Sequence, residues 1–203
     1  MKDLIIVGAG GFGREAYYLA KSIGRWNIKG FIDDNIDALN GIIIDSKIIG
    51  TISEWVPDNN QFFAMGISSP MVKEKISNLL RKRGAKFVTM IAPRASVNET
   101  AIIGEGSLIT SGSTIGDNAV IGNFVHVADS MVGQDSVIGD FSTTTGFVNT
   151  VTSKIGRRVF VGSHSVLLAD VADDAFICAG SIVFTRVKSG TKVMGNPAKK
   201  VIL

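Results

Sequence analysis

A glycine-rich segment near the start of the chain has the residue types and spacing of a phosphate-binding loop. Residues 8–13 read Gly-Ala-Gly-Gly-Phe-Gly, which satisfies the pattern G-x-G-x-x-G. Glycines permit a tight turn, and the N-terminus of a following helix offers free N–H groups and partial positive charge to an anion. Asp33 follows Gly13 by twenty residues, where a carboxylate can bind a ribose hydroxyl or a base. A tight structural turn without a ligand is the alternative.

The segments around this loop predict strands and a helix that position it. Residues 3–7 form an apolar run typical of a buried strand, and residues 14–23 predict a helix that ends at Gly24. Residues 28–32 and 61–65 predict two further strands. The loop therefore joins the first strand to the first helix.

A second helix is predicted from Ser69, an N-cap residue, and Pro70 at the first helical position. Its basic side chains predict a solvated face, and contact with an anionic substrate or a neighbouring subunit is the alternative. Val72, Ile76, Leu79 and Leu80 fall on one side of this helix, and the basic residues are Lys73, Lys75, Arg81, Lys82 and Arg83.

Residues 1–86 are thus predicted to form an α/β domain, a half-Rossmann βαβ arrangement around a parallel sheet. A full dinucleotide fold needs two such halves, and this segment is long enough for one. NAD is therefore disfavoured, and a mononucleotide diphosphate, such as that of an activated sugar, fits the available sheet.

From residue 91 onward, aliphatic residues recur with a period of six. This period suits short strands joined by sharp corners, with one side chain per strand pointing into a narrow prism. A five-residue step separates Val127 from Val132, and the pattern is lost for two rungs in residues 143–150, where we expect a corner insertion that builds a site. The inward positions are Ile91, Val97, Ile103, Ile109, Ile115, Ile121, Val127, Val132, Ile138, Ile155, Val161, Leu167, Val171, Ile177 and Val183.

Composition excludes several classes of protein. One cysteine permits no internal disulfide, and two histidines leave little for a metal centre, so we predict no metal. No apolar run approaches membrane-spanning length and the start lacks a signal-peptide layout, which predicts a cytoplasmic protein with no membrane partner. The net charge of +3 forms no basic stripe, which argues against nucleic acid.

The glycine loop, the hexapeptide repeats and the ending Gly195-Asn196-Pro197-Ala198-Lys199-Lys200 together resemble the sugar O-acyltransferase family of the sialic acid O-acetyltransferase type. That family includes bacterial nucleotide-amino-sugar N-acetyltransferases, and the match runs from about residue 3 to residue 201. The resemblance implies a left-handed parallel β-helix over residues 87–203 that binds acyl-CoA, a nucleotide-sugar-binding domain over residues 1–86, acetyl-CoA as co-substrate, and a homotrimer.

The same resemblance implies binding residues, carried over by position. The residues that would face the nucleotide-sugar are Gly10, Gly11, Phe12, Gly13, Asp33, Asp34 and Gly66. Those that would flank the pantetheine arm are Gly146, Gly162, Ser163 and Gly180, with a binding or packing role for His164, and Lys199 would approach the CoA phosphates.

At the catalytic position the sequence departs from the family pattern. Relatives generally place a histidine and a carboxylate just ahead of a Val-Ile-Gly rung, where the histidine accepts the proton of the attacking group. Gln134 and Asp135 stand there in this chain. An amide cannot hold a proton at neutral pH, and losing a general base typically costs about 10² to 10⁴ in rate.

Three explanations remain open. Asp135 keeps a carboxylate that could accept the proton. His126 lies seventeen residues before Thr143, nearly one coil, but out of register with Gln134, and a surface or intersubunit histidine is its alternative. An amine that loses its proton in solution needs no base if positioning supplies enough of the rate, which favours N-acetylation over O-acetylation.

The sequence therefore predicts an acetyl-CoA-dependent acyltransferase that acts on a nucleotide-linked amino sugar in polysaccharide or glycan precursor synthesis. One alternative is a catalytically impaired homologue that binds a nucleotide-sugar or an active partner, which Gln134 favours. Another is a purely structural solenoid, which leaves the glycine loop unexplained.

Overall fold

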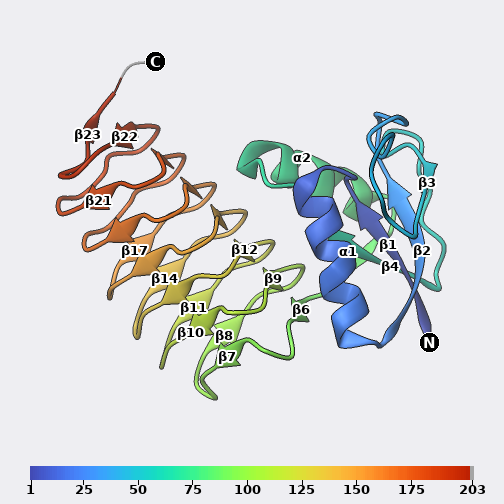
Figure 1. The fold of residues 1–203 in the computed structure, drawn as a ribbon, viewed down its shortest axis with the longest axis horizontal. Helices are drawn as coiled ribbons and strands as arrows, with labels where there is room; N and C mark the ends of the chain where they lie inside the picture. Colours follow the sequence, from blue (N-terminus) through green and yellow to red (C-terminus); the bar gives the residue numbers. More distant parts are fainter. Residues whose placement is uncertain (202–203) are drawn as a thin grey trace.

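The structure, a computed structural model, describes residues 1–201 as an α/β domain packed against a solenoid of stacked coils (Figure 1). Residues 202 and 203, which the predicted second domain includes, lie outside the described residues. The α/β domain contacts the coils as far as Arg158, and β23 (Lys199–Lys200) lies at the far end of the solenoid (Figure 1).

The α/β domain contains a five-stranded parallel sheet in the order β3-β2-β1-β4-β5. The strands are β1 (Lys2–Val7), β2 (Trp26–Ile32), β3 (Ile48–Gly50), β4 (Gln61–Met65) and β5 (Lys86–Phe87), and the helices are α1 (Gly11–Ile23) and α2 (Pro70–Lys82). Side chains alternate along β1, so that Leu4 and Ile6 share a core with α1 while Ile5 and Val7 share one with α2. The two helices thus cover opposite faces, as the βαβ pattern predicted.

The solenoid is a three-sided prism of parallel strands. The eight-stranded side contains β6 (Met90–Ile91), β9 (Leu108–Ile109), β12 (His126–Val127), β15 (Thr143–Thr144), β18 (Phe160–Val161), β20 (Phe176–Ile177), β22 (Lys192–Met194) and β23 (Lys199–Lys200), of which β23 alone is antiparallel. The six-stranded side contains β7 (Ser96–Val97), β10 (Thr114–Ile115), β13 (Met131–Val132), β16 (Asn149–Thr150), β19 (Val166–Leu167) and β21 (Ile182–Val183). The four-stranded side contains β8 (Ile102–Ile103), β11 (Val120–Ile121), β14 (Val137–Ile138) and β17 (Lys154–Ile155).

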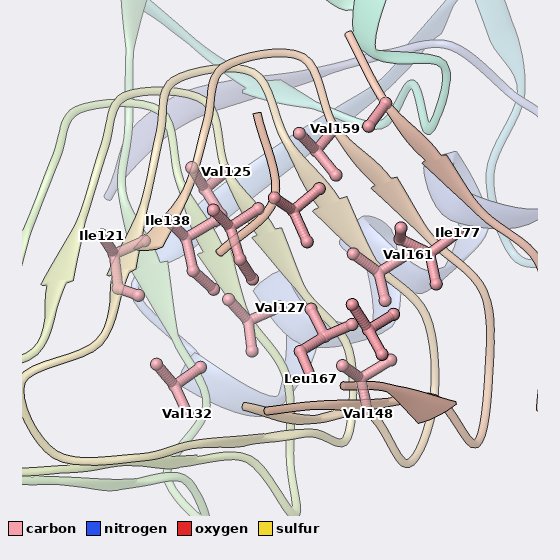
Figure 2. Packing of buried hydrophobic residues seen from close by; sticks show 14 of the residues in the cluster. Ile121, Val125, Val127, Val132, Ile138, Val148, Val159, Val161, Leu167 and Ile177 are labelled. Carbon is pink, nitrogen blue, oxygen red and sulfur yellow. The ribbon is translucent and has the colours of Figure 1, made fainter. Parts of the chain in front are cut away.

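Most of the predicted hexapeptide positions fill the interior of this prism. In the first coil, however, Ile91 is 39% exposed, and Val97 and Ile103 are half-buried. Residues of the period-six series, such as Ile121, Val127, Val132 and Ile138, are at most 1% exposed and converge on the axis (Figure 2). The left-handed parallel β-helix is therefore confirmed, with one aliphatic layer per rung.

The expected corner insertion at residues 143–150 is wrong. Strands β15 and β16 continue the ladders in register, and Thr144 and Thr150 occupy the inward positions at 0% and 1% exposure. Threonine has the branched shape of valine, so it fits the aliphatic layer. The irregularity is a second five-residue step, from Thr150 to Ile155.

Helix α2 buries the predicted face only in part, since Leu80 is buried and Ile76 packs against the same core. Val72 is 45% exposed, whereas Lys73, Ser77 and Leu80 are buried at the spacing i, i+4 and i+7. Lys73, expected on the solvated basic face, is 1% exposed. The helix packs against the sheet on one side and against the coils on the other. A prediction based on one apolar face therefore misses the second buried side.

Three features of the prism bear on the candidate site. The docking face is the outer side of the eight-stranded sheet, where α1 shares a core with Met90 and Leu108. The near edge is formed by the corners that join this sheet to the six-stranded one, residues 128–130, 145–148, 162–165 and 178–181. The far edge is formed by the corners between the six- and four-stranded sheets, residues 116–119 and 133–136, and lies opposite the docking face.

Candidate active site

The glycine loop lies where it can present backbone donors to an anion. It follows β1 directly, and α1 begins at Gly11 with Gly10 as its N-cap. No atom lies within 4 Å of the position that a Cβ would take at Gly10 or Gly11, so this part of the loop is open. The first amides of α1 have no partner within the helix and carry its partial positive charge.

Two other glycines of the region allow the backbone to pack closely. A Cβ on Gly13 would lie 1.9 Å from the carbonyl oxygen of Gly8, and one on Gly66 would lie 2.5 Å from Cα of Gly13. The Gly66 amide donates to the carbonyl oxygen of Val7 at 2.8 Å. The loops after β1 and β4 therefore touch at the point where strand order reverses, which is where open α/β sheets bind ligands.

Asp33 holds the glycine loop in place. Its Oδ2 accepts the Ala9 amide at 2.7 Å and its Oδ1 accepts the Asn35 amide at 2.9 Å. Asp34 is exposed and accepts the Ser53 amide at 2.8 Å. Both carboxylates stand at the carboxyl end of β2 beside the loop, as predicted, and both already bind backbone donors.

Beneath the loop, a buried polar seam joins the α/β domain to the docking face. We define the seam as Glu15, Lys73, His126 and Thr143; His126 and Thr143 are register partners on adjacent rungs. Phe12 packs edge-on against His126 with ring centroids 4.6 Å apart. The Phe12 side chain therefore points to the coil and not into the open part of the loop.

His126 is 2% exposed, and its Nε2 lies 3.4 Å from Oε2 of Glu15. Burial, and then the charge of Lys73, lowers the pKa of His126 to about 3. Burial, and then the charge of Asp129, raises the pKa of Glu15. His126 is thus a neutral, enclosed ring, and the structure does not support it as a base open to substrate.

The predicted catalytic pair stands on the far edge. Gln134 and Asp135 are exposed, and Asp135 accepts a bond from Nδ2 of Asn118 at 3.5 Å. Since the far edge is opposite the docking face, these side chains point away from the glycine loop of their own chain. The structure therefore does not bring them together with the predicted nucleotide-binding residues.

The residues predicted to flank the pantetheine arm line the near edge. The His164 amide donates to the carbonyl oxygen of Gly146 at 3.1 Å, and the Gly180 amide donates to that of Ser163 at 2.8 Å. Phe147 is 62% exposed and stacks on the His164 ring with centroids 5.0 Å apart. Gly162 lies beneath, where a Cβ would come within 2.5 Å of the Ala179 amide nitrogen.

Basic side chains gather at the C-terminal end of the coils. Arg186, Lys188 and Lys200 line a cavity of about 330 Å³ that also contacts Thr191. Lys199 is exposed on β23 beside this cavity. The cavity itself is lined by its neighbour Lys200 and not by Lys199. The arrangement can attract phosphate groups.

Sequence reasoning missed Lys73, Glu15 and Thr143. Lys73 and Ser77 are spaced by four residues and could have signalled a second buried face on α2. Thr143 had no local signal, because its partners Ser68 and Lys73 are distant in the chain.

Comparison with known proteins agrees with this architecture. Residues 3–80 match the family model of the PglD N-terminal domain, and residues 91–195 match that of the GMPPB C-terminal domain. The acetyltransferase domain of PglB from Neisseria gonorrhoeae FA1090 superposes with a TM-score of 0.91 at 23% identity, covering 99% of this chain and 100% of that chain. PerB from Caulobacter crescentus in complex with CoA and GDP-perosamine superposes with a TM-score of 0.88 at 18% identity, covering 99% and 98%.

Among curated proteins, UDP-N-acetylbacillosamine N-acetyltransferase of Bacillus subtilis (strain 168) is 26% identical over 110 residues. The match covers 52% of this chain and 50% of that protein, so the chain spans about half the length of this relative.

The fold defines a hexapeptide-repeat β-helix protein with an α/β first domain. Through residues 91–195 the chain belongs to the GMPPB C-terminal domain family, and its first domain matches the PglD N-terminal domain. The sialic acid O-acetyltransferase type suggested by the sequence is not confirmed. Within residues 1–201, no helix is long and apolar enough to cross a membrane.

Proposed function

We propose that the protein transfers the acetyl group of acetyl-CoA to the amine of a nucleotide-linked amino sugar. The observation that carries the proposal is the meeting of the glycine loop and Gly66 at the switch point of the sheet, with Gly10 and Gly11 open above it. The diphosphate would bind the amides at the start of α1. The Bacillus subtilis relative and the GDP-perosamine N-acetyltransferase of Caulobacter crescentus support an amine as acceptor, since both are named N-acetyltransferases.

Acetyl-CoA would lie along the near edge. Its pantetheine arm would pass Gly146, Ser163 and Gly180, and its phosphates would reach the basic cavity beside Lys199. A structure of the gonococcal PglB domain in complex with acetyl coenzyme A, at a TM-score of 0.89, supports this donor. The cytoplasm remains the proposed location.

Gln134 and Asp135 would act on the substrate of another chain. The far edge is opposite the docking face, so these residues can approach a glycine loop only if a second copy brings its far edge to that loop. This supports the homotrimer implied by the family resemblance. Each site would then combine the α/β domain and near edge of one subunit with the far edge of a neighbour.

In the reaction, the neutral amine attacks the thioester carbonyl carbon, an N–C bond forms, the C–S bond breaks, and CoA leaves as thiolate. The proton lost by the amine ends on the thiolate or on water. Gln134 can hydrogen-bond the amine or the carbonyl oxygen, and the carboxylate of Asp135 can accept the proton. The ammonium form of the acceptor loses its own proton to solvent before attack, and the proton released when the N–C bond forms can also pass to solvent.

The first test is a titration of the purified protein with acetyl-CoA by calorimetry, counting sites per chain. Micromolar binding at one site per chain is the expected result and justifies screening UDP-, GDP- and dTDP-linked amino sugars for turnover. No binding at millimolar acetyl-CoA contradicts acetyl transfer. The impaired homologue, for which the comparisons give no support, predicts binding without turnover on any of these sugars.

A further inference from the structure

Lys73 is buried without a carboxylate partner among the described residues. It is 1% exposed, and its Nζ donates to Oγ1 of Thr143 at 2.8 Å and to the carbonyl oxygen of Ser142 at 3.1 Å. Burying a lysine amine away from counter-charge is costly, and an apolar side chain of similar length would fill the same space at less cost. The two hydrogen bonds therefore need an explanation beyond packing.

The geometry matches a neutral amine. A neutral lysine has two N–H groups, and both find acceptors, whereas an ammonium group brings a third donor. Burial lowers the pKa of Lys73 to about 7, which agrees with this count. His126 and Glu15 are the seam's other titratable groups; the α2 neighbour Glu74 instead pairs with Arg157 and Arg158 on the coil.

Thr143 links Lys73 to a loop of the α/β domain by hydrogen bonds. Its Oγ1 accepts from Lys73 and donates to the carbonyl oxygen of Ser68 at 2.8 Å. Ser68 belongs to the segment 66–69, which starts at Gly66, packed on Gly13, and ends where the Lys73 amide donates to the carbonyl oxygen of Ser69 at 2.8 Å. Thr143 thus ties Ser68, in the loop that leads into α2, and Lys73, in the first turns of α2, to the coil.

We propose that Lys73 is a positioning residue that, through Thr143, fixes the segment 66–69 against the docking face and so sets the shape of the nucleotide-sugar site. An apolar residue can hold α2 on the coil, but it cannot direct the carbonyl oxygen of Ser68, because dispersion contacts have no preferred direction. The inference rests on the proposed function, in which Gly66 faces the same site as the glycine loop.

The experiment compares variants that remove the hydrogen bonds and keep the volume. Lys73→Met and Thr143→Val break the chain of bonds, and Thr143→Ser retains the hydroxyl as a conservative control. Arg81→Met is the matched control, because Arg81 also joins α2 to the coil, through Glu105 and the face of Phe124, about three turns away from the loop. Folding of each variant is checked by circular dichroism.

Two readouts are measured. Hydrogen exchange of residues 67–69 reports loop order without any ligand, and calorimetry with UDP, GDP and dTDP as diphosphate probes, alongside acetyl-CoA, reports the two binding sites. We expect Lys73→Met and Thr143→Val to speed exchange and to weaken the best diphosphate probe about tenfold, with acetyl-CoA affinity within about twofold. Thr143→Ser and Arg81→Met should match the wild type, and the double variant Lys73→Met/Thr143→Val should be no worse than either single one.

Unchanged exchange and probe affinity in folded Thr143→Val overturn the proposal, even if Lys73→Met fails to fold. Equal effects of Arg81→Met also overturn it, because they mean that any loss of docking has the same result. If the wild type binds none of the three probes, the proposed function fails, and hydrogen exchange alone then decides whether Lys73 positions the loop.

Discussion

Polar side chains are buried at the docking face of the prism and exposed on its far edge. On the docking face, Lys73 and His126 are 1% and 2% exposed and are enclosed between helices and strands. On the far edge, Gln134 and Asp135 are exposed at a corner. The difference indicates that the buried groups hold the α/β domain to the coil, whereas the groups expected to act on substrate stand where another chain must meet them.

The largest effect is expected where backbone packs on backbone above the docking face. In Gly13→Ala the new Cβ would lie 1.9 Å from the carbonyl oxygen of Gly8, and neither loop can move without losing contact with Gly66. We expect a loss of about 3 kcal/mol or more in the free energy of unfolding, lowering Tm by roughly 6–12 °C in calorimetry. Gly11→Ala, where nothing lies within 4 Å, is the matched control and should leave Tm unchanged. Equal Tm values for both variants would contradict the close contact.

The second test concerns the pH dependence of stability. The pKa of Lys73 is about 7 in the folded protein, below its ordinary value of 10.5. Between these values the unfolded chain binds more protons than the folded one, so the free energy of unfolding rises with pH from about 7 to 10.5. Below pH 7 the full cost of burying the charged amine lowers stability. In urea unfolding, Lys73→Met should be less pH-dependent than the wild type in this window, by up to a few kcal/mol. Parallel pH curves would mean that Lys73 is not enclosed in solution.

The prism was predictable from sequence because its signal is local. A period of six sets the inward side chain of each rung, and the same physics lets Thr144 and Thr150 stand in for valine, although a search for aliphatic residues passes over them. The glycine loop was predictable for a similar reason, because strand, loop and helix are consecutive.

The seam was not predictable because its parts come from distant segments. Lys73 meets Thr143 seventy residues away, and a lysine on an amphipathic helix is ordinarily solvated. For His126 the sequence suggested a catalytic role, because the chain has two histidines. Only the contacts with Phe12 and Glu15 show that its ring is buried and inaccessible to substrate.

On the far edge, Gln134→His should sharpen the contrast by adding a base beside Asp135. If proton removal limits the reaction, kcat for a nucleotide-linked amino sugar should rise about 10- to 100-fold, and the rate should acquire a pH dependence near the pKa of histidine. Gln134→Asn is the control and should not add this dependence. An unchanged rate in Gln134→His would mean that removing a proton from the amine does not limit the reaction, so that no protein base is needed.

The smallest effect is expected from the near edge, where an aromatic pair is exposed beside the proposed pantetheine path. Phe147 stacks on His164 at 5.0 Å, while Phe160 and Phe176 form a comparable stack at 4.8 Å on the outer end of the docking face. Phe147→Ala should weaken acetyl-CoA binding about three- to tenfold in calorimetry, the loss of about one aromatic contact, without a change in Tm. Phe176→Ala removes a similar stack from a surface with no proposed ligand and should leave the affinity unchanged. If Phe176→Ala weakens acetyl-CoA binding and Phe147→Ala does not, the donor lies along the docking face, and the near edge is then free to meet the neighbouring subunit.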